Sequence, residues 1–213
     1  MNDLILKATD LSKSFSHNGE QVHVLSHIDM VVEKGSFTVI MGASGSGKST
    51  LLYALSGMDK ATAGKVIYNG TDLTSLSESR LAALRRRDFG FIFQQMHLVS
   101  NLTLFENVAV SGYLDKKVSA SEVKRHANEL LDSMGLSEVK DHRPAQVSGG
   151  EQQRCAIARA VINTPEIVFA DEPTGSLNRR NSIEVLDMLS GLNNKGQTIL
   201  MVTHDLKAAL RAD

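Results

Sequence analysis

The sequence predicts an α/β protein built on a mostly parallel β-sheet. Four short apolar runs, at residues 37–41, 89–93, 167–170 and 198–203, are separated by stretches with helical periodicity. Such alternation is typical of parallel strands joined by crossover helices. The first run is apolar almost throughout and ends at a glycine-rich turn, so we expect it to be buried on both faces.

The opening third and the middle third of the chain differ from this pattern. Residues 4–11 and 22–32 are predicted to be strands. Residues 102–161 are predicted to be entirely helical, and we interpret them as a subdomain inserted into the sheet domain. The alternative is that they are ordinary crossover helices of the sheet. In the first interpretation the chain forms a single domain, in which residues 1–101 and 162–213 make up the core together with a β subdomain.

Two capping boxes mark helix starts in this middle region. In each, a serine is followed three residues later by a glutamate, as at Ser119 and Glu122 and again at Ser148 and Glu151. After the first box, apolar residues recur on one helical face until Gly135. These residues are Val123, Ala127, Leu130, Leu131 and Met134.

Composition limits the classes of function. A chain of 213 residues that is 42% hydrophobic suits one compact domain. The net charge of -1 gives no overall field that would favour nucleic acid, and we expect no nucleic-acid partner. The three arginines at residues 85–87 lie beside Asp88 and are better explained as a solvated helix end. One cysteine, Cys155, excludes an internal disulfide and a multi-cysteine metal site, so any metal is expected to have oxygen ligands.

No apolar run approaches the roughly 20 residues that a membrane-spanning helix needs. The N-terminus carries Asp3 where a secretion signal would be basic, so export is not expected. Any membrane role would therefore depend on a separate partner.

The strongest motif is a glycine-rich loop between the run at residues 37–41 and a predicted helix at residues 50–56. Its pattern, G-x-x-x-x-G-K-S, is that of a phosphate-binding loop. Backbone N–H groups would surround phosphate oxygens, Lys48 would reach the β- and γ-phosphates, and the Ser49 hydroxyl would bind Mg²⁺. A flexible turn that happens to contain Lys-Ser is the alternative. The loop comprises Gly42, Ala43, Ser44, Gly45, Ser46, Gly47, Lys48, Ser49 and Thr50.

A second motif places two carboxylates at the end of the run at residues 167–170. Asp171 and Glu172 follow it directly, at the edge where parallel sheets bind ligands. Asp171 would hold the metal through water, and Glu172 would polarise the water that attacks the γ-phosphate. A solvated acidic pair is the alternative.

A third motif is the bare helix start at Ser148, Gly149, Gly150 and Glu151. Its two glycines allow an anion to approach the helix N-terminus closely, which makes it a second phosphate site. Two phosphate sites far apart in one chain are explained if each nucleotide is shared between two copies. An ordinary capped helix start is the alternative.

Together these motifs resemble those of ABC-transporter nucleotide-binding domains, and the stretch from Ser148 to Glu151 looks like their signature motif. The resemblance implies ATP and Mg²⁺ as cofactors and an ABC ATPase fold. That fold has a P-loop NTPase core with a mostly parallel sheet, an N-terminal antiparallel β subdomain and an inserted helical subdomain.

Three further residues match this family in the expected order. Gln94 resembles the Q-loop glutamine that senses Mg²⁺ and the γ-phosphate, and His204 resembles the switch histidine that contacts the γ-phosphate beside Glu172. Taken singly, such residues are more often ordinary surface groups. Phe15 stands where the family places an aromatic ring against adenine, although core packing explains it nearly as well.

The match has departures. Asn178 stands where the family usually has an aspartate, so hydrogen bonding is kept without the charge, and communication between the two sites is expected to differ. Val147 replaces the usual leucine, with little expected consequence. Only residues 205–213 follow His204, whereas family members usually continue through further strands. We therefore expect a truncated chain with its C-terminal strands missing.

The resemblance also implies a function in transport. Glu151 and the runs at residues 90–95 and 170–175 resemble the branch of lipoprotein-releasing, macrolide-exporting and bacitracin-type peptide transporters. Two copies would bind two ATP molecules, hydrolyse them and drive a separate transmembrane permease that exports or extracts a lipoprotein, peptide or drug. The ATPase would lie at the cytoplasmic face of the cell membrane without touching the cargo.

Two alternatives stay open. A non-transport ABC ATPase that regulates a membrane or cell-division complex would keep every motif, whereas a P-loop kinase or GTPase would explain only the loop that ends at Ser49. A hydrophobic rim after Gln94 is a candidate docking surface for the permease, with core packing as the alternative. It consists of Met96, Leu98, Val99 and Leu102.

Overall fold

The computed structural model describes residues 3–17, 20–115 and 117–211. Its central element is a parallel sheet with the strand order β3-β8-β7-β6. The strands are β3 (Phe37–Met41), β6 (Phe89–Phe93), β7 (Ile167–Asp171) and β8 (Thr198–Thr203), and every neighbouring pair is parallel. The four predicted runs are thus strands of one sheet, and the predicted α/β class is confirmed.

A second, antiparallel sheet is built mainly from the N-terminal part of the chain, with the order β2-β1-β4-β5. It contains β1 (Leu4–His17), β2 (Glu20–Glu33), β4 (Ala63–Tyr68) and β5 (Thr71–Asp72). The first two strands are longer than predicted, because backbone pairing continues through exposed polar residues whose sequence carries no apolar alternation.

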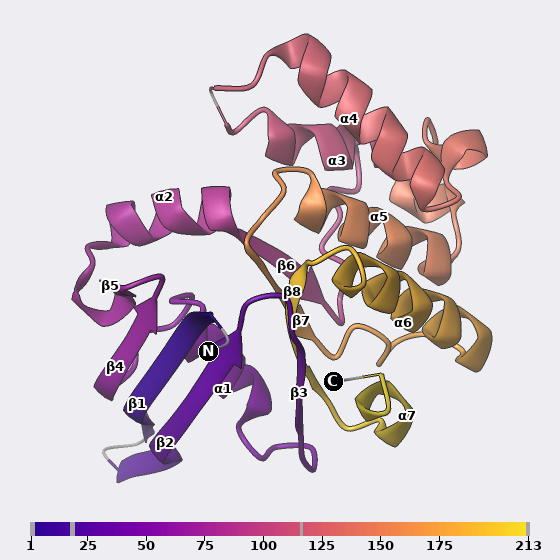
Figure 1. The fold of residues 1–213 in the computed structure, drawn as a ribbon. Helices are drawn as coiled ribbons and strands as arrows, with labels where there is room; N and C mark the ends of the chain where they lie inside the picture. Colours follow the sequence, from indigo (N-terminus) through magenta and orange to yellow (C-terminus); the bar gives the residue numbers. More distant parts are fainter. Residues whose placement is uncertain (1–2, 18–19, 116, 212–213) are drawn as a thin grey trace.

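Seven α-helices and three short 3₁₀ segments surround the sheets within the described residues (Figure 1). Figure 1 shows the antiparallel sheet at lower left, the parallel sheet near the centre, and α3 and α4 at the top. The helices are α1 (Lys48–Leu55), α2 (Glu78–Asp88), α3 (Leu104–Gly112), α4 (Ala120–Ser133), α5 (Gly149–Val161), α6 (Arg179–Asn193) and α7 (Leu206–Ala209), and the 3₁₀ segments are η1 (Leu73–Ser75), η2 (Ser137–Val139) and η3 (Pro144–Gln146).

Helices and 3₁₀ turns are the regular elements between residues 102 and 161, as predicted for that region. Both predicted capping boxes are present, at the starts of α4 and α5. Gly135 ends the α4 turn with a positive φ of 65°, a conformation that glycine adopts without strain. The division into a core and an inserted helical subdomain stays a prediction.

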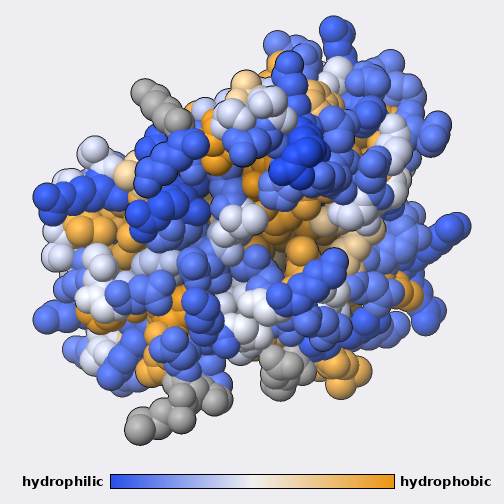
Figure 2. Space-filling view, turned by 45° about the horizontal axis from the view of Figure 1, so that its top comes forward, coloured by the Kyte–Doolittle hydropathy of each residue, from blue (hydrophilic) through white to orange (hydrophobic). Residues whose placement is uncertain are grey.

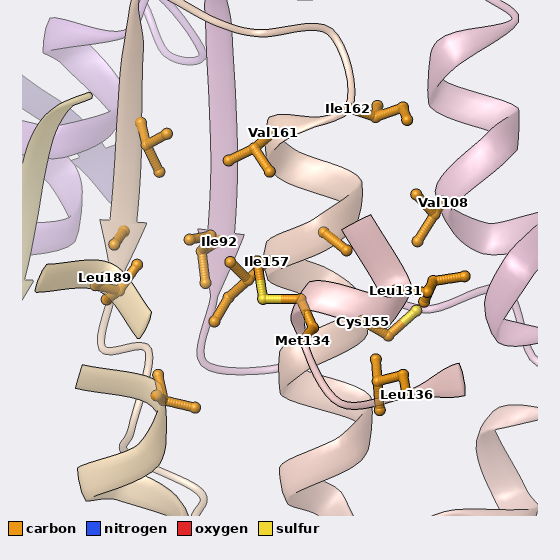
Figure 3. Packing of buried hydrophobic residues seen from close by; sticks show 14 of the residues in the cluster. Ile92, Val108, Leu131, Met134, Leu136, Cys155, Ile157, Val161, Ile162 and Leu189 are labelled. Atoms are coloured by element: carbon orange, nitrogen blue, oxygen red, sulfur yellow. The ribbon is translucent and has the colours of Figure 1, made fainter. Parts of the chain in front are cut away.

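Alternate residues of the parallel strands separate two hydrophobic clusters. Phe169 and Val202 face α1 and the antiparallel sheet, whereas Ala170 and Met201 face α5, α6 and the helical region. Figure 3 shows the second cluster, to which β6, α5 and α4 contribute side chains, among them Ile92, Ile157 and Leu131. Because side chains of a strand alternate between faces, one strand holds both halves of the molecule together.

The surface seen in Figure 2 is mostly hydrophilic, with hydrophobic side chains gathered near its middle. Among the described residues, no helix combines the length and the apolar character that crossing a membrane requires.

Candidate phosphate-binding site

The glycine-rich loop joins the end of β3 to the start of α1. Gly45 and Gly47 have φ values of 78° and 86°, in the left-handed region that favours glycine. Gly47 is also the N-cap of α1 and offers no side-chain cap, so the N–H groups of the first turn are left for a ligand. The loop therefore has the geometry of an anion site at a helix N-terminus.

Lys48 lies across this loop with its side chain buried. Its Nζ donates hydrogen bonds of 2.9 Å to the carbonyl oxygens of Gly42 and Ala43. The same Nζ lies 3.8 Å from Oε1 of Glu172. The ammonium group is thus held above the loop and close to the second carboxylate.

Asp171, at the end of β7, is bonded to two hydroxyls of α1. Ser49 donates to its Oδ1 at 2.7 Å, and Tyr53 donates to its Oδ2 at 2.6 Å. Burial and this hydrogen bond raise the pKa of Tyr53 well above its ordinary value, so the phenol stays protonated and acts as a donor. The predicted metal residues Ser49 and Asp171 are therefore in direct contact.

Glu172 adopts a φ of 46°, which is uncommon outside glycine and typical of functional sites. Its Oε2 lies 2.9 Å from Nδ1 of His204 and accepts hydrogen bonds from the His204 N–H at 3.4 Å and from the Thr203 hydroxyl at 3.3 Å. The end of β8 thus fixes this carboxylate toward the loop.

These groups surround one cavity of about 730 Å³. It contains most of the loop residues, together with Gln94, Glu172 and His204. Asp171 is reached through Ser49, which lines it. The lining consists of Val24, Ala43, Ser44, Gly45, Gly47, Lys48, Ser49, Thr50, Gln94, Glu172 and His204.

Phe15 is not among the residues that line this cavity. Its ring is 44% exposed on β1, with Nζ of Lys13 4.8 Å from the ring centre. Lys13 in turn pairs with Asp59 at 2.6 Å. Phe15 is thus an exposed aromatic residue rather than a core residue, and a role in base stacking stays a prediction.

The predicted second phosphate site also lies outside the cavity lining. Ser148 Oγ accepts a hydrogen bond from the Glu151 N–H at 3.3 Å, and the Ser148 N–H donates to Glu151 at 2.7 Å. The Ser148 hydroxyl also donates to the Glu151 carboxylate at 2.7 Å. This bond first, and the one from the Ser148 N–H second, lower the pKa of Glu151. A Cβ on Gly150 would lie 2.5 Å from the Asn181 amide, so a larger residue there would displace the Asn181 side chain on α6.

The donors at the cavity fit a magnesium nucleotide. Mg²⁺ is usually held by one or two carboxylates and substrate phosphates and keeps several waters. Asp171 and the Ser49 hydroxyl supply that kind of oxygen set beside the loop. No cluster of three or more histidine, cysteine or acidic side chains that could hold a metal alone occurs in the described part of the chain.

Sequence reasoning missed Tyr53, Thr203 and Val24. Tyr53 follows Ser49 by four residues on α1, and this spacing puts both side chains on one helical face. That spacing was a usable signal for Tyr53. Thr203 reaches the site through the pairing of β8 with β3 and β7, and Val24 through the packing of β2 against the loop at Gly47. The local sequence pattern reveals neither contact.

Comparison with known proteins gives the chain a set of relatives. The family profile described as ABC transporter matches residues 25–175. A lipoprotein-releasing system ATP-binding protein, LolD of Idiomarina loihiensis, is 42% identical over 210 residues, which are 98% of this chain and 92% of that protein. The macrolide export ATP-binding/permease protein MacB of Vibrio parahaemolyticus is 42% identical over the full 213 residues, and this chain spans 32% of its length.

A solved structure is similar over nearly the whole chain. It is the dimeric, post-hydrolysis state of an ATP-binding cassette bound to ADP and Pi, with a TM-score of 0.90 and 35% identity. The match covers 98% of this chain and 91% of the other.

Proposed function

Because this chain belongs to the ABC transporter ATP-binding family and is an ATPase of the LolD and MacB type, we propose that it powers a transporter. Two copies close around two ATP molecules and drive a separate transmembrane permease at the cytoplasmic face of the cell membrane. The observation that carries this proposal is the convergence of the loop, Glu172 and His204 on one cavity.

The chain's own residues divide the work of hydrolysis. The α1 N-terminus and Lys48 bind the phosphates, for which Lys48 exchanges its bonds to Gly42 and Ala43. Glu172 orients the attacking water and accepts its proton, while His204 holds that carboxylate. Bound Mg²⁺, held by Ser49, Asp171 and Gln94, would neutralise charge on the phosphates.

The signature stretch acts on the other copy. Ser148 to Glu151 form the capped N-terminus of α5, with glycines at its first two positions, and they are not among the residues that line the chain's own cavity. A phosphate approaching this stretch would therefore come from a nucleotide bound to a second chain. The dimeric arrangement of the similar cassette with ADP and Pi supports this assignment.

The surface that we propose for docking of the permease is a groove of about 480 Å³ between α2, β6 and α3. Its apolar lining includes Phe91, Val99 and Val110, and the last two are 46% and 41% exposed. Arg86 and Arg159 also line it, which suits a short amphipathic helix carrying an acidic residue. Of the predicted rim, Val99 lines the groove, whereas Leu98 packs against the core.

The cargo is proposed to be an envelope substrate, namely a lipoprotein, a peptide or a drug. The names of LolD and MacB support this choice. A non-transport ATPase that regulates a membrane or cell-division complex is the second candidate. Co-purification separates the two candidate functions, because a transport ATPase should co-purify with a multi-span permease and a non-transport ATPase should not.

Hydrolysis by the purified chain tests the proposed mechanism. Wild type should hydrolyse Mg-ATP, and Glu172→Gln should lose at least about 100-fold in rate while still binding ATP, because the carboxylate acts only in the chemical step. Lys48→Ala should lose nucleotide binding itself. Retention of full activity by Glu172→Gln would contradict the role given to this residue.

A further inference from the structure

Asp171 is restrained at both of its carboxylate oxygens, by two residues one helical turn apart. Ser49 holds Oδ1 and Tyr53 holds Oδ2, at 2.7 and 2.6 Å. Both donors project from α1, and Asp171 itself is only 8% exposed. Hydrogen bonds at both oxygens of a planar group fix its rotation as well as its position.

Tyr53 is itself held in place. Its ring lies 6.5 Å from that of Phe93, between centroids, and packs against the buried cluster of the antiparallel sheet and α1. Phe93 is the last residue of β6 and immediately precedes Gln94. The phenol is therefore a fixed donor with few alternative rotamers, which is the property expected of a group that orients a metal ligand.

We propose that Tyr53 is a positioning residue for the metal site, which holds the Asp171 carboxylate in the orientation that receives Mg²⁺. The inference rests on the proposed function, since it assumes that Asp171 faces the metal of a bound nucleotide. Ser49 is expected to turn its hydroxyl to the metal when the nucleotide binds. Tyr53 is then the donor that keeps Asp171 from rotating.

If Tyr53 has this role, its hydroxyl should affect the affinity for the metal but not the affinity for a metal-free nucleotide. Lys48, which we assign to the phosphates, is held by the carbonyl oxygens of Gly42 and Ala43 and not by Tyr53. Loss of the phenol hydroxyl should therefore weaken the metal and leave metal-free nucleotide binding intact. Replacement of a group that orients a metal ligand typically lowers metal affinity by roughly 10-fold or more.

The test compares Tyr53→Phe with wild type in two binding measurements. Mn²⁺ binding to the protein in saturating ADP is followed by the electron paramagnetic resonance of free Mn²⁺, and ADP binding is measured separately in EDTA. Tyr53→Phe should bind Mn²⁺ about 10-fold more weakly with unchanged ADP affinity in EDTA. The Mg²⁺ concentration for half-maximal hydrolysis should rise by a similar factor.

Tyr68→Phe is the matched control, because it removes the hydroxyl of another tyrosine in the same cluster, whose ring packs on Phe89. It should leave both affinities unchanged. Equal Mn²⁺ affinity in Tyr53→Phe and wild type would overturn the inference, as would a loss of ADP binding in EDTA, which would indicate general disruption. Failure of wild type to bind ADP at all would instead contradict the proposed function.

Discussion

The strain of the site is concentrated on one residue, Glu172. Its φ of 46° follows directly after a fully paired strand, and its backbone N–H donates to the Val202 carbonyl at 2.9 Å. Such a conformation costs on the order of 1–3 kcal/mol and persists only where neighbours impose it. Here the end of β8 holds the residue at both ends, because Val202 accepts its backbone N–H while Thr203 and His204 contact its carboxylate.

Cys155 provides a residue-scale prediction on the core. The thiol is fully buried, and burial raises its pKa to about 12. At neutral pH it is neither ionised nor accessible, so it should react with a thiol reagent only after unfolding. The labelling rate should rise along the denaturant transition measured by circular dichroism. Rapid labelling of the native protein would contradict the packing of α5 against α3.

At this scale the sequence was informative wherever chemistry depends on residue type and spacing. Lys48, Ser49, Asp171 and Glu172 were all predicted to act together, and the structure brings them together. Tyr53 was not found, since an aromatic residue in an amphipathic helix is ordinarily read as core. Their roles in binding and catalysis stay proposals.

At the scale of elements, capping boxes determine the residues at which the helices of the helical region begin. The boxes of α3, α4 and α5 each pair a Ser or Thr N-cap with a glutamate three residues later. Asn178 caps α6 in a related way, since its Oδ1 accepts a hydrogen bond from the Asn181 N–H at 3.0 Å. An aspartate would serve that purpose equally, so the departure from the family pattern leaves the helix start unchanged.

The α5 cap predicts a specific acid sensitivity. The folded pKa of Glu151 lies below its ordinary value of 4.5, chiefly because the Ser148 hydroxyl donates to it. Its stabilisation is therefore complete above that value and is lost as pH falls through the folded pKa. The wild-type free energy of unfolding should fall between about pH 7 and about pH 4. In Glu151→Gln this fall should be smaller than in wild type, by less than about 1 kcal/mol.

Urea denaturation at the two pH values checks this. Glu138→Gln, at an exposed position of η2, is the control and should keep the wild-type difference. An identical pH difference in Glu151→Gln would show that the cap contributes no acid-dependent stability.

Elements were predictable where the apolar pattern was strong. The four parallel strands and α4 were identified, but β4 and β5 were not. Gly64 explains part of this, because a Cβ there would lie 2.3 Å from the Asp10 carbonyl oxygen. The strand is defined by its close approach to β1, a tertiary constraint that appears locally only as a glycine before a short apolar run, Val66 to Tyr68.

At the scale of the molecule, substitutions in the groove beside β6 should show whether its apolar residues dock a permease or pack the core. Val99→Asp and Val110→Asp should abolish co-purification with a permease and spare ATP binding, because both side chains are exposed in the groove. Leu98→Asp should lower the free energy of unfolding by about 2 kcal/mol or more, since it would place an unpaired charge against the core. Its expression should fall as a consequence. Loss of ATP binding in all three variants would point to core packing instead.

The central claim is that two chains share each nucleotide, and the solution mass of Glu172→Gln with and without Mg-ATP tests it most directly. This variant should bind ATP without turnover, so the mass should double with Mg-ATP and return to that of a monomer when Ser148 is also replaced by a bulky residue such as phenylalanine. An unchanged mass with ATP demonstrably bound would contradict the shared site.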